Sequence, residues 1–276
     1  MDLHKPKPWH GWREFLKELG TIALGVAIAL AAEQAVEWLH WRAQVSDAKE
    51  AIASEMARDI GIAILRLRTE TCVEQRLDEL NHVINASIQS GRLPPIGNIA
   101  RPASYSLSLG VWDSVVSSQT ATHFPRPYLA NLALNYRRIQ RMSEDIDQEA
   151  SVWNDLDIMV GPGGPLDPVT MNNLRKSLSH ARFFNRFITS LSAGIIRNLK
   201  QTELPFSPQD LAVIARARGR LEETYKVSIT SPYVPDAVCQ PIGQAPQEYG
   251  QSHDSAVPDL VGDELKNLPD FSKNAP

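Results

Sequence analysis

Two Glu-x-x-His pairs are the residues whose spacing comes nearest to known metal chemistry. Glu37 and His40 form one pair, and Glu79 and His82 form the other. In helical di-iron proteins such pairs lie on two facing helices, and two further carboxylates complete the site. Here both pairs fall on one predicted helix, 42 residues apart. We therefore interpret them as solvated polar residues rather than metal ligands.

The other motifs that could carry chemistry are incomplete. Ser46 and Lys49 have the spacing of an acyl-enzyme nucleophile, but the companion motifs do not occur in the sequence. His123 and His180 have no Cys or His at zinc-ligand spacing. The GPGGP loop at 161–165 lacks the Gly-Lys-Ser/Thr of a phosphate-binding loop. The sequence thus predicts no catalytic residue, no metal site and no cofactor.

The chain has two cysteines, Cys72 in a predicted long helix and Cys239 in a proline-rich stretch. In an oxidising compartment they can form a disulfide that joins the C-terminal region to the helical domain. Two free thiols are the alternative. Two cysteines in 276 residues do not decide between these states.

Polar residues beside a tryptophan form a possible binding surface between two predicted core helices. They are Trp112, Asp113, Ser117, Ser118, Gln119, Thr120 and His123. Loops held on rigid helices often bind ligands. Ser and Thr also bond to nearby backbone groups at helix ends. We favour a capping layer that closes the bundle over a ligand site.

The first element that would position these groups contains an apolar run. No charged residue occurs from Leu19 to Ala32, and extending the run to Leu39 gives 21 residues with Glu33, Gln34 and Glu37 as its strongly polar members. This length crosses a hydrocarbon core, although the acidic residues make insertion marginal. We predict an N-terminal segment at 1–18 and a transmembrane helix at 19–41.

Four of the six tryptophans flank this run, two on each side: Trp9, Trp12, Trp38 and Trp41. Tryptophan is enriched at membrane interfaces. Trp12 and Trp38 are 26 residues apart, which is about 39 Å of helix at ~1.5 Å per residue. Basic residues are more frequent before the run than after it, which predicts a cytoplasmic N-terminus and a folded domain outside the cytoplasm.

A cleaved signal peptide and a buried helix of a soluble protein are the alternatives. Ala29-Leu30-Ala31 can be read as a cleavage site, but Glu14 and Glu18 dilute the positive charge that precedes a signal core. Cleavage would also leave the tryptophan pairs without an explanation. The uncharged run alone has only 14 residues, a length that buried helices share.

One face of the predicted span carries a small or polar residue at every fourth position: Thr21, Gly25, Ala29, Glu33 and Glu37. Gly25 and Ala29 would let a second helix approach closely, and that helix could shield or pair Glu33. Alanine-rich spans also contain such spacings by chance. Self-association through this face is therefore a hypothesis, and Gly25→Leu tests it by its effect on the oligomeric state.

Beyond the span, apolar residues recur every three or four positions, which predicts helices. The first stripe runs from Val45 towards Gly91, as one long helix that leads from the membrane into the domain and is bent near Gly61 or at 68–71. Further helices are predicted at about 111–120, from Pro127 to Gly161, from Pro168 to about Ile195, and from Pro208 to about Ile229. Asp167 is the predicted N-cap of the helix at Pro168, and residues 207–210 (SPQD) resemble a capping box before the last helix. No stretch alternates long enough to predict a sheet. The predicted fold is all-α, with an irregular helical bundle at 42–229.

Composition separates this domain from the C-terminal region. The formal net charge of −4 gives no support for a nucleic-acid-binding protein, which should show a basic domain. Residues 230–276 hold seven prolines, seven acidic residues and two lysines. Such a composition buries little apolar surface, so we predict a flexible acidic tail.

The N-terminal region resembles a family of uncharacterised bacterial single-span membrane proteins. The similarity rests on residues 18–30 (ELGTIALGVAIAL), followed by Trp38 and a long charged helix. Residues 92–95 (RLPP) and 112–125 (WDSVVSSQTATHFP) are also similar to proteobacterial members, so the resemblance covers about residues 12–225. It implies a single-pass inner-membrane protein with a periplasmic helical domain, and it implies no catalytic residue.

Three classes of function are compatible with this organisation. The first is a membrane-tethered interaction or scaffold protein, whose partners are the lipid bilayer and another envelope protein or a second copy, without nucleic acid. The second is an extracytoplasmic sensing module that acts through a membrane partner. The third is an enzyme with a dispersed site. The combination of span, bundle and tail favours the first.

Overall fold

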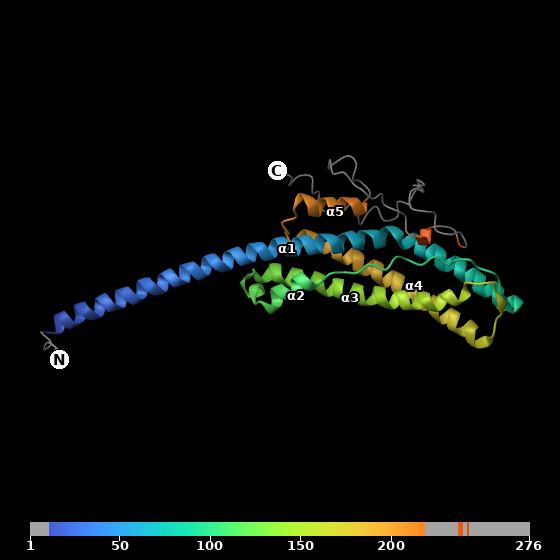
Figure 1. Ribbon diagram of the computed structural model, residues 1–276, viewed down its shortest axis with the longest axis horizontal. Coiled ribbons are helices and arrows are strands. Elements are labelled where there is room, and N and C mark those ends of the chain that lie inside the picture. The colour runs from blue at the N-terminus through green and yellow to red at the C-terminus, as the bar shows by residue number, and fades with distance from the viewer. Residues whose placement is uncertain (1–10, 219–236, 240–241, 243–276) are drawn as a thin grey trace, which may run out of the picture. The chain divides into compact units, whose positions relative to one another are not determined.

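The computed structural model describes residues 11–218, 237–239 and 242, and these residues are largely helical (Figure 1). In chain order the elements are α1 (Trp12–Ser90), β1 (Arg92–Leu93), α2 (Gly110–Ser117), η1 (Thr120–His123), α3 (Arg126–Leu156), η2 (Asp157–Met159), β2 (Gly164–Pro165), α4 (Pro168–Asn198), η3 (Leu199–Gln201), α5 (Pro208–Arg218) and η4 (Ala237–Cys239), where η marks a 3-10 helix. The predicted all-α bundle is confirmed. Most of the predicted tail, and the extension of the last helix to Ile229, lie outside the described residues.

α1 is a single helix of 79 residues. The chain divides into two compact units within it, at residues 1–47 and 48–276. Gly91 follows the helix with φ +67°, the left-handed conformation in which glycine commonly ends helices. The predicted continuation of the apolar run into the first helix of the domain is therefore found.

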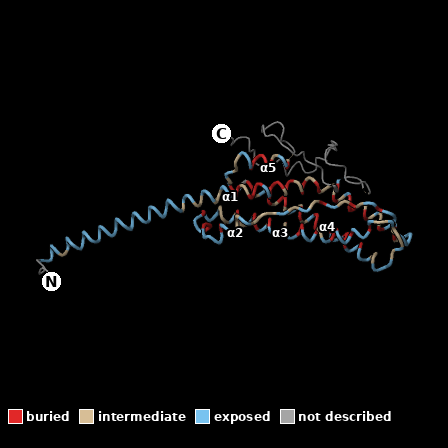
Figure 2. Tube along the Cα trace, in the orientation of Figure 1, coloured by how far each residue is buried: buried red, intermediate tan, exposed pale blue. Residues whose placement is uncertain are grey.

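The core of the second unit lies around α1, whose residues from Ile52 to Thr69 are buried on almost every side (Figure 2). Helices cover it from different directions. Tyr136 of α3 and Asn185 of α4 form hydrogen bonds with acidic and basic side chains of α1. On another side, Arg68 of α1 donates to the Ala217 carbonyl oxygen of α5 at 2.8 Å. Because α1 is enclosed in this way, charged residues beside its apolar stripe are buried as well.

α3 and α4 form a second helix pair in the bundle. Arg138 of α3 donates to the Gly194 carbonyl oxygen of α4 at 3.0 Å. A Cβ at Gly194 would lie 3.3 Å from the Arg138 Nε, so the glycine lets this side chain cross α4 closely. Asp167 begins α4, as predicted, because its side chain accepts the backbone N–H groups of Val169 and Thr170.

α5 packs on α1 at Gly61. A Cβ at this position would lie 3.7 Å from Val213 Cγ1 and 3.8 Å from Ala217 Cβ, which is ordinary van der Waals contact. The predicted capping box begins α5, since the Asp210 carboxylate accepts the Ser207 N–H at 2.9 Å and the Ser207 hydroxyl accepts the Asp210 N–H at 3.2 Å.

Gly61→Ala is expected to raise the free energy of unfolding by about 0.5–1 kcal/mol, because alanine forms helix interiors better than glycine and its methyl group fits against α5. Gly61→Leu should have the opposite effect, since its larger side chain would displace α5. Chemical unfolding followed by circular dichroism measures both. An alanine variant less stable than the wild type would show that the contact has no room for a methyl group.

A short β-pair was not predicted. β1 and β2 pair antiparallel, with Arg92 opposite Pro165 and Leu93 opposite Gly164. Each strand has two residues, which is too short to produce an alternating pattern. Gly163 adopts φ +75° here, and a Cβ on it would lie 2.9 Å from the backbone N of Pro95. The GPGGP segment thus ends α3 and η2, as predicted, and also joins two loops.

Candidate functional site

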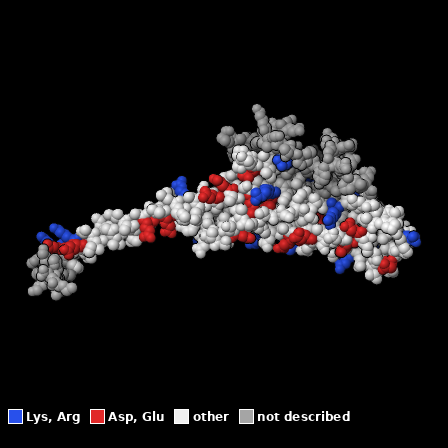
Figure 3. Space-filling view, in the orientation of Figure 1, with Lys and Arg blue, Asp and Glu red and all other residues white. Residues whose placement is uncertain are grey.

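The apolar run predicted to cross a membrane lies in the N-terminal part of α1 and is exposed along its length. Its large apolar side chains are 50–68% exposed: Leu19, Ile22, Leu24, Val26, Ile28, Leu30, Val36 and Leu39. Figure 3 shows the stretch at 19–32 without charged side chains, with acidic groups at both of its ends. By length and composition α1 can span a membrane, and none of its most apolar window is buried. Exposed apolar surface of this extent is typical of membrane and protein interaction sites.

The tryptophans on either side of the run are also accessible. Trp12 is 74% exposed and Trp38 is 58% exposed. The Arg42 guanidinium lies 5.3 Å from the Trp38 ring centroid. Trp41 donates to Glu37 at 3.4 Å. Trp9 lies outside the described residues.

The small and polar stripe of the run is exposed as well. Thr21 donates its hydroxyl to the Lys17 carbonyl oxygen at 2.9 Å, and a Cβ at Gly25 would meet no atom within 4 Å. Ala29 and Glu33 are exposed. Self-association through this face stays a prediction.

The Glu-x-x-His pairs do not come together at a metal site. His40 hydrogen bonds to Gln44 at 2.9 Å, and Glu79 pairs with Arg76 at 2.9 Å. Among the described residues, no group of three or more His, Cys, Asp or Glu side chains could hold a metal ion. In the motif of Ser46 and Lys49, the Lys49 ammonium lies 4.9 Å from the Tyr128 ring centroid.

Cys72 and Cys239 are joined by a disulfide, with their Cα atoms 4.8 Å apart. The bond connects η4 to α1 across 167 residues of sequence. Val238, the neighbour of Cys239, is 2% exposed. The start of the C-terminal region is thereby fixed on the surface of α1.

Two of the polar residues predicted beside Trp112, Ser117 and Ser118, bond to their own turn, as does the neighbouring Thr122. Ser117, Ser118 and Thr122 donate their hydroxyls to the carbonyl oxygens of Ser114, Val115 and Gln119, respectively. This pattern is the capping layer that we favoured. Trp112 differs, because its ring stacks on Tyr136 with centroids 4.7 Å apart.

The Tyr136 side chain lies beside a pair of buried carboxylates on α1. They are Glu55 and Asp59, each 1% exposed. Glu55 accepts the Tyr136 hydroxyl at 2.9 Å and the Ser108 hydroxyl at 2.8 Å. It also accepts the backbone N–H of Val111 at 2.9 Å and that of Trp112 at 3.3 Å. The residue before α2, Leu109, provides no side-chain cap. Glu55 therefore caps α2 from another helix, where its negative charge is favourable.

Asp59 lies one turn further along α1. Its Oδ1 accepts the Ser108 N–H at 3.1 Å, and its Oδ2 has no hydrogen-bond partner among the described residues. Burial raises the pKa of Asp59 to about 7; the Ser108 hydrogen bond and Arg58 oppose this rise, and the Glu55 charge adds to it. Burial and the same Glu55 charge also raise the pKa of Tyr136. Asp59 can thus bind a proton near neutral pH.

A second buried network joins α1, α3 and α4. Arg66 pairs with Glu149 at 2.9 Å, and it donates to Asn185 at 3.4 Å. Asn185 in turn donates to Glu74 at 3.1 Å. Nε and Nη1 of Arg66 have no hydrogen-bond partner among the described residues. Buried pairs of this kind add little net stability, but removing one partner is strongly destabilising because it leaves a buried charge without compensation.

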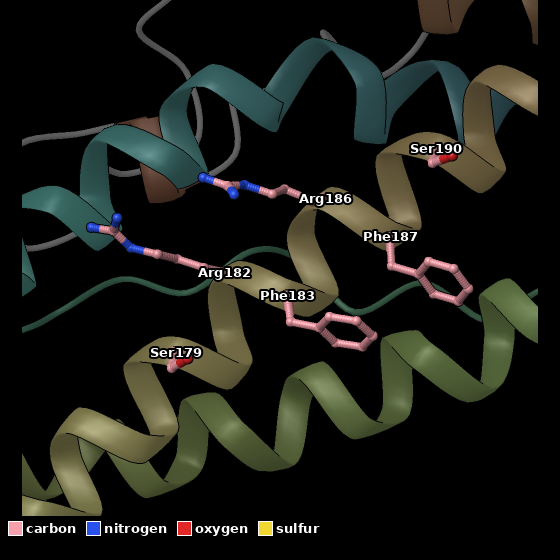
Figure 4. A pocket seen from close by; sticks show the side chains of 6 residues that line it. All are labelled: Ser179, Arg182, Phe183, Arg186, Phe187 and Ser190. Carbon is pink, nitrogen blue, oxygen red and sulfur yellow. The ribbon is translucent and has the colours of Figure 1, made fainter.

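A shallow groove lies along the outer face of α4. It is lined by Ser179, Arg182, Phe183, Arg186, Phe187 and Ser190 (Figure 4). Both arginine side chains extend toward α1 and both phenylalanine side chains toward α3. Phe183 is 56% exposed. Exposed aromatic and arginine side chains are typical of protein interfaces.

The sequence analysis missed the buried charges. Glu55, Asp59 and Arg66 each precede a residue of the apolar stripe, namely Met56, Ile60 and Leu67. A helical residue one position from the stripe lies about 100° away from it, at the edge of the apolar face. This position is buried only when the helix is covered from more than one side. The repeated charged residues beside the apolar stripe were the sequence feature that could have indicated buried charges.

The described residues therefore form three features: an exposed apolar stretch of α1, a buried carboxylate pair at the start of α2, and an aromatic and arginine groove on α4. The first was predicted from the sequence and the other two were not. No family model, curated protein or solved structure matches this chain.

Proposed function

We propose that this protein is a single-pass membrane-anchored scaffold whose helical bundle binds other proteins of the cell envelope. One observation carries the proposal: α1 supplies both the exposed apolar run and the buried central helix of the bundle. A protein built in this way holds its bundle at the membrane surface. The α4 groove supports the interaction role, because its Phe183 and Arg186 side chains are exposed.

The bundle lies on the extracytoplasmic side in this proposal, with residues 1–18 in the cytoplasm. Two observations support this orientation. Lys5, Lys7, Arg13 and Lys17 precede the run, and positive residues favour the cytoplasmic side. The disulfide between Cys72 and Cys239 is of a kind that persists in oxidising compartments. The resemblance to bacterial single-span proteins leads to the same assignment, in the inner membrane.

The test is a topology measurement on the full chain. A reporter that is active only in the periplasm, fused after Thr230, is expected to be active, and mass spectrometry should find the original N-terminus. The same reporter fused after Lys17 is the control and should be inactive. Cleavage near Ala31 would contradict the anchor, and an inactive Thr230 fusion would place the bundle in the cytoplasm.

Proton sensing is a second candidate, favoured by the buried carboxylate pair. Asp59 changes its protonation near pH 7, and the neighbouring Glu55 holds the start of α2. A change of charge here would act on the helix that carries Trp112. The pH dependence of an Asp59 variant, given in the Discussion, tests the underlying titration.

A further inference from the structure

The charged residues of α4 are all basic. This helix carries five basic residues and no acidic residue: Arg175, Lys176, Arg182, Arg186 and Arg197. The C-terminal residues 243–276, which the structure does not describe, have the opposite balance, with six acidic residues and two lysines. The chain thus contains an acidic segment and a basic helix that could bind each other.

The α4 groove combines apolar surface with positive charge. Phe183 and Phe187 are stacked, with ring centroids 5.7 Å apart. The Arg141 guanidinium lies 5.6 Å from the Phe187 centroid on the α3 side. On the α1 side, Arg182 pairs with Asp78, and Arg186 pairs with Glu74 at 3.5 Å. A suitable ligand would present apolar side chains to the phenylalanines and carboxylates to the arginines.

The guanidinium groups of these arginines can still donate hydrogen bonds to further acceptors. The Arg186 side chain is 71% exposed, and its Nε lies 3.5 Å from a carboxylate oxygen of Glu74. A guanidinium has five N–H donors in a planar fork, which suits a carboxylate. The two terminal nitrogens of Arg186 are thus suited to an additional carboxylate from solvent or from the chain.

We propose that residues 259–271 of the same chain (DLVGDELKNLPDF) occupy this groove and so compete with an external partner for it. The segment alternates the two required chemistries: apolar Leu260, Val261, Leu265, Leu268 and Phe271, and acidic Asp259, Asp263, Glu264 and Asp270. The inference rests on the proposed function, in that it identifies the α4 groove as a protein-binding surface.

The disulfide brings this segment within reach. Cys239 is bonded to Cys72, two residues before Glu74, which contacts Arg186. Two residues correspond to about 200° around a helix, so the tether starts on the other side of α1, whose diameter is about 10–12 Å. The 20 residues from Cys239 to Asp259 can span at most about 66–72 Å. Tethering also raises the effective concentration of the segment at the groove.

The experiment places a photo-crosslinker in the groove of the full chain. p-Benzoylphenylalanine replaces Phe183, the protein is irradiated in detergent and in cells, and the products are mapped by mass spectrometry. We expect a crosslink within one chain between position 183 and residues 259–271. The same crosslinker at Val116, which is 50% exposed on α2, is the control and should not give this product.

Charge reversal in the segment tests the chemistry of binding. Asp263→Lys with Glu264→Lys should lower the yield of the 183 crosslink several-fold, and Asp254→Lys, outside the segment, should leave it unchanged. An unaltered yield with the double variant would overturn the proposal.

The remaining outcomes separate this inference from the proposed function. A crosslink from position 183 to a second copy or to another envelope protein, without the product within the chain, would overturn the inference and leave the α4 groove as an interface. No crosslink of any kind would overturn the inference and also remove the support that the groove gives to the proposed function.

Discussion

Glu55→Ala should lower the free energy of unfolding by about 3–5 kcal/mol, the range observed when one partner of a buried charged network is removed. The Glu55 carboxylate accepts hydrogen bonds from Tyr136, Ser108, Val111 and Trp112. Its removal leaves the first N–H groups of α2 and a buried tyrosine hydroxyl without this acceptor. Denaturant unfolding followed by tryptophan fluorescence measures the loss, because Trp112 stacks on Tyr136.

Two further variants separate this role from a general effect on α1. Glu50→Ala removes an exposed carboxylate of the same helix, and surface changes of this kind stay within about 0.5 kcal/mol. Glu55→Gln keeps one acceptor oxygen but introduces N–H donors where donors already point, so an intermediate loss is expected. Equal stability of the Glu55→Ala and Glu50→Ala variants would show that the carboxylate does not hold α2.

The helices were predictable because their signals are local. Asp167-Pro168 and Ser207-Pro208-Gln209-Asp210 cap α4 and α5 through contacts within four residues of sequence. The apolar run of α1 is likewise a property of consecutive residues. These features depend on backbone geometry and side-chain periodicity, which a sequence shows directly.

The candidate sites depend on contacts that are distant in sequence. Glu55 caps a helix that begins 55 residues later, and no local pattern indicates which helix start a glutamate will reach. Arg66 meets Glu149 across 83 residues. The short β-pair similarly joins residues 92–93 to 164–165. Such pairings follow from how the helices pack, which periodicity alone does not determine.

Asp59 gives the second large prediction, a stability that falls as the pH rises from about 4 to about 7. Burial raises the pKa of this carboxyl from 3.8 to about 7. Between these values the folded state keeps the proton and the unfolded state loses it, so increasing pH favours the unfolded state. Below pH 4 both states are protonated, and above pH 7 both are ionised, so the contribution is constant outside this range.

Asp59→Asn removes this titration while keeping an acceptor oxygen for the Ser108 N–H. Relative to the wild type, the variant should therefore gain stability as the pH rises from about 4 to about 7, by up to about 4 kcal/mol for a shift of this size. The measurement is the difference in the free energy of unfolding between variant and wild type at several pH values, which cancels the titration of unaffected groups. Asp113→Asn, at an exposed position of α2, is the matched control, and its difference from the wild type should stay within about 0.5 kcal/mol. A flat difference for Asp59→Asn would mean that this carboxyl is ionised in the folded protein throughout the range, and the proton-sensing candidate would then lose its basis.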